Sequence, residues 1–405
     1  MSTSSGSERV LSGMRPTGAL HIGHYHGALK NWVNLQHEYD CYFFVADWHA
    51  LTTNYEDPGL IRKATWDTVI DWLAAGIDPS LCKIFVQSFV PEHAELTLLL
   101  GMGTPLSWLE RVPTYKDQQQ KLSDRELATY GFLGYPLMQS ADILIYRPKY
   151  VPVGEDQVPH IELTREIARR FNHLYGREPE FETLAESAVK KMGKKAAKIY
   201  KRLQREYQEQ GKEESLDVAR ALVAEQQNLS MGDRERLLGY LEGGSRIILP
   251  EPEAKLTPAA KLPGLDGQKM SKSYNNTISL REANDSIDQK IRTMTTDPQR
   301  VRRNDPGDPD KCPVFDLHRI YSDESTREWA AKGCRSAGIG CIDCKKPLID
   351  AVVNEIEPMR RRASEYEGDL PAVQELVIKG SEDARSVAQE TMAEVRDAMG
   401  LVSRQ

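Results

Sequence analysis

The chain has 405 residues, of which 40% are hydrophobic and 28% charged, and its formal net charge is -7 at pH 7. This length exceeds what one hydrophobic core usually serves, so we expect several domains. No apolar run approaches the roughly 20 residues of a membrane-spanning helix, and the polar, Ser-rich residues 1–9 are unlike a signal peptide, so we expect a cytoplasmic protein without a membrane segment. The negative charge offers no overall attraction to nucleic acid, and any RNA contact must rest on local basic patches.

Short apolar runs alternate with longer amphipathic stretches in residues 1–177. The runs Tyr42–Ala46, Lys83–Val86 and Tyr150–Val153 are typical of buried strands. Strands that alternate with helices form a parallel sheet covered by helices. We therefore predict an α/β domain with a Rossmann-like, doubly wound parallel sheet, and residues 1–177 form its first part.

The rest of the chain is predominantly helical in pattern. Residues 178–246 are rich in Lys, Glu, Gln and Ala at helical spacing, which predicts a helical insertion. The run Arg246–Leu249 predicts a strand that resumes the sheet, so residues 247–285 form the second part of the α/β domain. Residues 286–405 are predicted to form an all-helical C-terminal domain.

The predicted insertion contains a run of basic residues with no acidic residue between Lys190 and Arg205. An apolar stripe at helical spacing can lie opposite them, formed by Val189, Met192, Ala196, Ile199, Leu203 and Tyr207. One face could then pack while the other meets phosphate. Because the charge of the whole insertion is balanced, a charged face that contacts only solvent is the simpler alternative. The basic residues are Lys190, Lys191, Lys194, Lys195, Lys198, Lys201, Arg202 and Arg205.

The first motif that suggests chemistry is the segment Ser12–His24, which runs from a short strand through a glycine-containing turn into a predicted helix. A helix N-terminus there would direct unpaired N–H groups and a positive dipole toward a phosphate. His21 and His24 are three residues apart and so share one face of a helix, and Gly23 lets adenine or phosphate approach the backbone. Taken alone, the tetrapeptide could also occur by chance.

The second motif, Lys269–Ser273, follows the glycine-containing loop Pro263–Gly267. Lys269 and Lys272 are three residues apart and can bind a leaving pyrophosphate and neutralise the charge that grows in the transition state. A solvated loop is the alternative for such a pentapeptide on its own. The two motifs occur in order, one near the start of the sheet and the other after its last predicted strand, which favours a shared nucleotide site.

Together the two motifs resemble the HIGH and KMSKS elements of class I aminoacyl-tRNA synthetases. Further blocks resemble those of the tryptophanyl enzymes in order: Ala46–Thr52, Glu110 and Arg111 with Lys116, Tyr135–Leu144, Val151–Gln157 and His160–Arg165. The resemblance covers nearly the whole chain outside residues 178–246. It implies a homodimeric enzyme that converts L-tryptophan and ATP, with Mg²⁺, to tryptophanyl-adenylate and pyrophosphate, and then transfers tryptophan to tRNA(Trp).

The resemblance also implies roles for individual residues. Lys272 is the chief stabiliser of the leaving group, assisted by Lys269 and Lys116, and His21 and His24 complete the catalytic set. Residues 286–405 are implied to bind the anticodon. The implied ATP-binding residues are Arg15, Pro16, Thr17, Gly23, His24, Gly154, Glu155, Asp156, Leu262, Lys269, Met270, Ser271, Lys272 and Ser273.

The amino-acid pocket must distinguish tryptophan from tyrosine. Tyr135, Gln139 and Asp142 lie at positions i, i+4 and i+7, on one face of a helix. By resemblance Asp142 accepts the indole N–H, while Tyr135 and Gln139 lie near the substrate ammonium, and His49 and Gln157 complete the tryptophan-binding set. A buried acceptor selects strongly, because a substrate without the donor leaves it unpaired. Gln139 stands where the tryptophanyl pattern has Met, so a tyrosyl enzyme remains an alternative, as does a non-catalytic RNA-binding relative.

Four cysteines occur in the C-terminal region: Cys312, Cys334, Cys341 and Cys344. In a cytoplasmic chain, a Cys-x2-Cys pair with two further cysteines upstream favours a metal–thiolate site over disulfides. Structural zinc and a 4Fe-4S cluster both accept four thiolates. The spacing resembles that of an iron-sulfur branch of tryptophanyl enzymes, which implies the cluster, with zinc as the alternative. Cys41 and Cys82 remain in predicted strands.

Overall fold

The computed structural model describes residues 8–112, 129–176, 180–210, 212–242, 246–256 and 262–402. The chain divides into two compact units, each built from separate stretches of sequence. Unit 1 comprises Met1–Phe89, Pro152–Glu155 and Lys255–Asp383. Unit 2 comprises Val90–Val151, Asp156–Ala254 and Ala384–Gln405.

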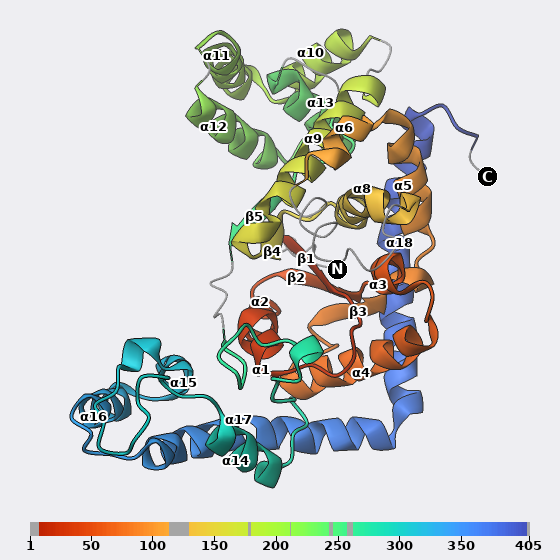
Figure 1. Ribbon diagram of the computed structural model, residues 1–405. Coiled ribbons are helices and arrows are strands. Elements are labelled where there is room, and N and C mark those ends of the chain that lie inside the picture. The colour runs from red at the N-terminus through yellow and green to blue at the C-terminus, as the bar shows by residue number, and fades with distance from the viewer. Residues whose placement is uncertain are drawn as a thin grey trace. The chain divides into compact units, whose positions relative to one another are not determined.

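A five-stranded sheet has the strand order β3-β2-β1-β4-β5. Strands β1 (Arg9–Met14), β2 (Asp40–Val45) and β3 (Cys82–Val86) pair in parallel, and Cys41 is the register partner of Cys82. Five consecutive residues of β2 are buried, as expected of a strand covered on both faces. The predicted α/β class and parallel sheet are confirmed (Figure 1).

The predicted strands near residues 42–46, 83–86 and 150–153 are present, the last as β4 (Tyr150–Val153). The predicted strand Arg246–Leu249 is wrong, because these residues form no strand and the last strand is β5 (Glu253–Leu256). The backbone N–H groups of Ile248 and Leu249 both donate to Asn172 Oδ1, at 2.9 and 3.0 Å. The Asn172 side chain therefore accepts two backbone N–H groups that would otherwise need the carbonyl groups of a neighbouring strand.

Helices of unit 1 flank its strands, and α4 packs against α17, which in turn packs against α14 (Figure 1). Trp32 stacks on Phe43 with ring centroids 4.6 Å apart, and Trp72 meets Trp32 edge-on, so aromatic rings fill the space between sheet and helices. The helices are α1 (Ile22–His24), α2 (Lys30–Leu35), α3 (Asp47–Asn54), α4 (Gly59–Ala75), α14 (Asn284–Thr293), α15 (Pro313–Tyr321), α16 (Glu324–Arg335) and α17 (Cys341–Gly368), with the π-helix η1 (Tyr25–Leu29) and the short 3-10 helices η2 (Gln87–Phe89), η4 (Lys272–Tyr274) and η5 (Pro309–Lys311). The long α18 (Leu370–Ala398) begins in this unit.

In unit 2, α8 packs against α5 and α9, while α10 to α13 contact one another. The helical content of residues 181–241 agrees with the predicted pattern. None of the helices in the described part of the chain is long and apolar enough to span a membrane. The helices are α5 (Glu92–Gly103), α6 (Leu106–Glu110), α8 (Tyr130–Leu144), α9 (Val158–Tyr175), α10 (Phe181–Lys191), α11 (Lys194–Gln210), α12 (Glu213–Ala224) and α13 (Met231–Leu241), and the turn η3 (Glu155–Gln157) precedes α9.

Candidate active site

His21 and His24 lie against each other at the start of α1, where His21 is the residue before the helix. Their ring centroids are 3.8 Å apart, and the backbone N–H of His21 donates to His24 Nδ1 at 3.3 Å. Burial, together with the nearby Lys272 charge, lowers the pKa of His21 to about 4 and that of His24 to about 3. Both imidazoles are therefore neutral at pH 7, and they offer hydrogen bonds rather than positive charge.

Gly23 leaves room for the His21 ring, which lies against its backbone. A Cβ atom at this position would lie 2.9 Å from the His21 ring and 3.6 Å from Met270 Sδ. His21 Nδ1 is buried and has no hydrogen-bond partner in the described part of the chain. Buried polar atoms without a hydrogen-bond partner are rare, and a hydrogen bond to a bound substrate would supply the missing partner of His21 Nδ1.

The segment after the lysine motif is joined to the histidine segment by backbone hydrogen bonds. The N–H of Ile22 donates to the carbonyl of Ile278, and the N–H of Leu280 donates to the carbonyl of Leu20, both at 3.0 Å. The two motifs, about 250 residues apart in sequence, thus meet within unit 1.

Lys272 lies across this junction. Its Nζ donates to the carbonyl oxygen of Thr17 at 3.0 Å, next to Gly18, which has φ +96°. Burial lowers the pKa of Lys272, and the carboxylates Asp71 and Asp67 oppose that change. The Lys272 ammonium group donates to a carbonyl oxygen, and the two nearby imidazoles are neutral. It can therefore bind an anion without first breaking a strong ion pair.

Asp71 and Arg281 hold the junction together, and no local motif in the sequence points to them. Asp71 is fully buried; its Oδ2 accepts the N–H of Leu20 and its Oδ1 accepts Arg281 Nε, both at 2.6 Å. Burial raises the pKa of Asp71 to about 6, although the Arg281 charge acts in the opposite direction. The pair therefore connects the backbone just before His21 to the segment after the lysine motif.

Asn276 organises the lysine loop itself and was also missed by sequence reasoning. It is buried, and its Oδ1 accepts the N–H of Ser271 at 2.8 Å. Its Nδ2 donates to Asp266 Oδ1 at 2.7 Å and to the carbonyl of Lys269 at 3.2 Å. One side chain therefore holds three points of the loop that carries both lysines.

The remaining predicted nucleotide residues differ in their surroundings. Pro16, Leu262 and Met270 are buried, whereas Lys269, Glu155 and Asp156 are exposed. Gly154 and Glu155 belong to unit 1 and Asp156 to unit 2. Lys116 lies outside the described residues. The predicted roles of Arg15, Gly154, Glu155, Asp156 and Ser273 toward ATP stay predictions.

Tyr135, Gln139 and Asp142 all lie on α8, so the predicted helix is confirmed. The Asp142 side chain is only 1% exposed, and its Oδ1 lies 2.6 Å from His93 Nδ1. His93 Nε2 in turn lies 2.7 Å from the hydroxyl of Tyr146. His93 comes from α5, so its contact with Asp142 arises from the packing of two helices, which the sequence pattern of α8 does not reveal.

Two other members of the predicted tryptophan set are buried, at least in part. Gln139 Oε1 is buried without a hydrogen-bond partner among the described residues, and His49 on α3 is 3% exposed. Gln157 Nε2 donates to Asp156 Oδ2 at 3.0 Å. His49 belongs to unit 1 and the other members belong to unit 2. Their roles toward tryptophan stay predictions.

The four C-terminal cysteines are free thiols. No group of three or more His, Cys, Asp or Glu side chains in the described ranges is arranged to hold a metal ion. Burial raises the pKa of the Cys344 thiol to about 12, and Cys312, Cys334 and Cys341 act in the same direction. A metal centre at this place is therefore a proposal rather than an observed feature.

Comparison with known proteins agrees with the two motifs. The family described as tRNA synthetases class I (W and Y) matches residues 3–206 and 215–356. A Tryptophan–tRNA ligase of Ralstonia nicotianae is 65% identical over 394 residues, with 97% of this chain and 98% of that protein covered. A Tryptophan–tRNA ligase of Thermotoga maritima is 44% identical over 396 residues, covering 97% and 99%.

Among solved structures, the chain is similar to tryptophanyl-tRNA synthetase from Campylobacter jejuni complexed with ADP and tryptophan. The TM-score is 0.71 at 27% identity, and the match covers 97% of this chain and 100% of that one. Fold, ordered motifs and near-complete coverage thus agree. The chain belongs to the class I tRNA synthetase family of the tryptophanyl and tyrosyl enzymes.

Proposed function

We propose that the protein activates L-tryptophan with ATP and transfers it to tRNA(Trp). The relatives described above, up to 65% identical along nearly the whole chain, are tryptophan–tRNA ligases, which does not favour the tyrosyl alternative. The observation that carries the proposal is the junction of Lys272, His21 and His24 within unit 1. That junction combines one cation with two neutral hydrogen-bonding rings, which can together stabilise the charge of a triphosphate and of its leaving pyrophosphate.

The reaction needs no protein nucleophile. The tryptophan carboxylate attacks the α-phosphorus of ATP, and pyrophosphate leaves with the electron pair of the broken P–O bond. Lys272 stabilises the negative charge that grows on the leaving group, assisted by Lys269, while His21 and His24 hydrogen-bond to the nucleotide. The magnesium ion that accompanies ATP would supply further positive charge there. The terminal ribose hydroxyl of the tRNA then attacks the adenylate carbonyl and releases AMP.

Amino-acid-dependent exchange of pyrophosphate into ATP tests this function directly. Each of the twenty amino acids is assayed separately with the purified protein, ATP and magnesium. We expect rapid exchange with tryptophan and exchange with tyrosine lower by a large factor, because a site built to accept an N–H donor rejects a substrate that lacks it. Faster exchange with tyrosine would transfer the assignment to the tyrosyl enzymes, and no exchange with any amino acid would indicate a non-catalytic relative.

For the four cysteines we propose a 4Fe-4S cluster, with zinc as the alternative. Several features support this: no disulfide uses these thiols, and Cys334 Sγ lies 3.8 Å from Arg300 Nη1. Cys344 Sγ lies 3.5 Å from His318 Nε2. Nitrogen donors directed at thiolate sulfurs are a common way of tuning such centres. The cluster would stabilise the fold between η5 and α17, away from the adenylate chemistry of Lys272.

Protein purified without oxygen is expected to be brown, with a broad absorption band near about 400 nm from thiolate-to-iron charge transfer. Replacement of Cys341 by serine should remove the colour and lower thermal stability, whereas replacement of Cys41, a buried cysteine of β2, should leave the colour intact. Colourless protein with one equivalent of zinc would assign the site to zinc. Metal-free protein with full aminoacylation activity would remove the metal site altogether.

The finer points of assembly and location remain predictions. A homodimer is supported by exposed apolar side chains on α5 and α6, where Leu98, Met102 and Leu106 are each about 60–70% exposed. A mass measurement in solution tests the homodimer.

The predicted cytoplasmic location rests on the N-terminal sequence. The predicted domain boundaries at residues 177, 246 and 285 rest on sequence pattern, and so does the predicted binding of the anticodon by residues 286–405.

A further inference from the structure

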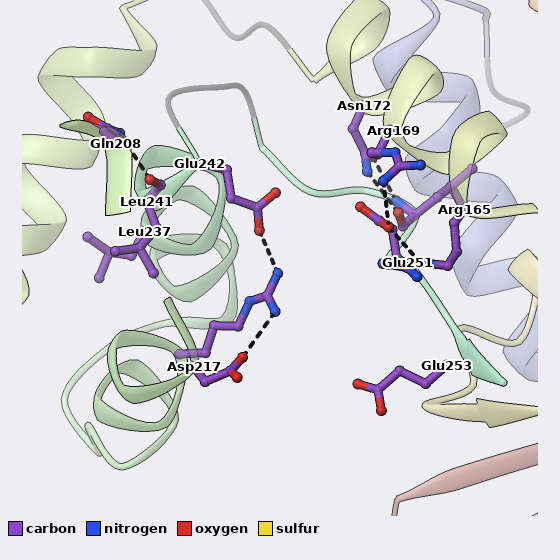
Figure 2. Close-up of polar contacts among 12 residues, drawn as sticks. Arg165, Arg169, Asn172, Gln208, Asp217, Leu237, Leu241, Glu242, Glu251 and Glu253 are labelled. Carbon is purple, nitrogen blue, oxygen red and sulfur yellow. Dashed lines mark hydrogen bonds and ion pairs between the residues drawn. The ribbon is translucent and has the colours of Figure 1, made fainter. Parts of the chain in front are cut away.

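Helices α10 to α13 pack around a core of their own within unit 2. Val189, Tyr200, Leu203 and Leu237 are buried in it. The Tyr200 hydroxyl donates to the carbonyl of Leu237 at 2.6 Å. Gln208 Nε2 donates to the carbonyl of Leu241 at 3.0 Å (Figure 2). Of the predicted apolar stripe, Ala196, Ile199, Leu203 and Tyr207 of α11 pack on this core as predicted, whereas Val189 lies on α10 and Met192 at its end, so the stripe is divided between two helices. These contacts determine which side of α11 faces inward.

The opposite side of α11 is positively charged. Its basic side chains are all exposed, and helical spacing places them on one side of the helix, away from Tyr200 and Leu203. At 1.5 Å per residue the set spans roughly 16 Å along the helix. One strand of a nucleic-acid duplex carries a phosphate about every 3.4 Å of axis, so this span corresponds to several consecutive phosphates. We call this set the basic face of α11: Lys194, Lys195, Lys198, Lys201, Arg202 and Arg205.

The lysines of the basic face are not used in holding the insertion together. Lys194, Lys195, Lys198 and Lys201 form no ion pair with any described residue, and Arg202 approaches Glu206 only at 3.7 Å. The neighbouring acids, in contrast, have internal partners.

Arg220 Nη2 lies 2.8 Å from Glu242, and Arg220 Nη1 lies 3.6 Å from Asp217 (Figure 2). Lys191, just before α11, pairs with Asp233 at 2.8 Å. The balanced charge of the insertion is therefore separated in space: several acids are neutralised locally, whereas the four lysines of the basic face point to solvent.

We propose that the basic face of α11 binds the sugar–phosphate backbone of the tRNA substrate. This inference rests on the proposed function, which makes tRNA the anionic macromolecule that the protein must bind. The net charge of -7 repels RNA from most of the surface, so a concentrated row of cations marks where contact is favourable. Lysines are flexible point charges that suit phosphate contacts without reading bases, and each neutralised phosphate releases counterions. The alternative is a face that serves only solubility.

Four simultaneous substitutions, Lys194→Gln, Lys195→Gln, Lys198→Gln and Lys201→Gln, test the proposal. We expect tRNA(Trp) to bind about tenfold or more weakly at low salt, and the plot of log affinity against log salt to become shallower by about 0.7–0.9 for each phosphate that the variant no longer neutralises. Tryptophan-dependent pyrophosphate exchange, which needs no tRNA, should be unchanged. Absence of that exchange in the parent protein would refute the proposed function, whereas the tRNA measurement addresses only the face.

The same four positions changed to arginine supply the matched control, because arginine keeps both the charge and the helix propensity. This variant should bind tRNA(Trp) within about threefold of the parent. An unchanged affinity and salt dependence in the glutamine variant would overturn the proposal. An equal decrease of affinity in the glutamine and arginine variants would overturn it too, since the effect would then arise from packing and not from charge.

A second measurement uses the unaltered chain and so does not depend on how the variants fold. Lysines are acetylated with and without deacylated tRNA(Trp), and modification is read by mass spectrometry. Lys198 and Lys201 should be protected several-fold more than Lys63 of α4 and Lys379 of α18, which are exposed lysines outside the insertion. Equal modification of the basic face with and without tRNA would contradict the proposal.

Discussion

Replacement of Lys272 by alanine is expected to slow tryptophan-dependent pyrophosphate exchange by about 10²–10³-fold, or roughly 3–4 kcal/mol of transition-state stabilisation. Tryptophan affinity should hardly change, because the role proposed for the lysine is to stabilise charge that develops on the leaving pyrophosphate. The structure gives the reason: Lys272 Nζ donates to the Thr17 carbonyl at 3.0 Å rather than to a carboxylate, so its charge is available to a phosphate. Exchange kinetics together with calorimetric tryptophan binding measure the two effects separately.

Two comparisons make the Lys272 result specific. Lys272→Arg keeps a cation at the position and should recover part of the lost rate. Lys63→Ala, on the exposed side of α4, should leave exchange unchanged. A parental exchange rate in Lys272→Ala would remove this lysine from the catalytic set, whereas a slower rate matched by an equal decrease of tryptophan affinity would indicate a disturbed fold.

Replacement of Asp142 by alanine is expected to raise the KM for tryptophan by about 10- to 100-fold while the KM for ATP stays near that of the parent. In this variant the substrate N–H loses its acceptor, which costs about 1–3 kcal/mol. A carboxylate accepts about four hydrogen bonds, so the contact with His93 does not by itself exclude an indole N–H at Asp142. Exchange kinetics with varied tryptophan and varied ATP separate the two constants.

The same prediction can be tested at His93, which positions Asp142 and has no proposed contact with the substrate. His93→Asn can still offer an N–H and should raise the KM for tryptophan less than His93→Ala does, with little change in the KM for ATP. Tyr146→Phe keeps the ring and removes the hydroxyl that contacts His93, so it serves as a milder step in the same series. Asp142 is not the indole acceptor if the tryptophan affinity of Asp142→Ala equals that of the parent.

The sequence alone determined the parts of this protein that depend on local pattern. Continuous apolar runs identified β2, β3 and β4, and the i, i+4, i+7 spacing identified the face of α8 that carries Asp142. The two nucleotide motifs were recognisable because a phosphate site needs small, basic and hydrogen-bonding residues in a short ordered stretch. The strand expected at Arg246–Leu249 failed because a local apolar run does not reveal that Asn172 satisfies its backbone.

Only the tertiary structure decided which distant residues support those motifs. Asp71 and Arg281 are 210 positions apart, and His93 and Asp142 are 49 apart, yet each pair meets at 2.6 Å. Such partners have no fixed sequence spacing, because they are brought together by the packing of separate helices and loops. The physical reason is that a buried polar group must find a partner wherever the fold supplies one, while a helix or strand is specified by its own neighbours along the chain.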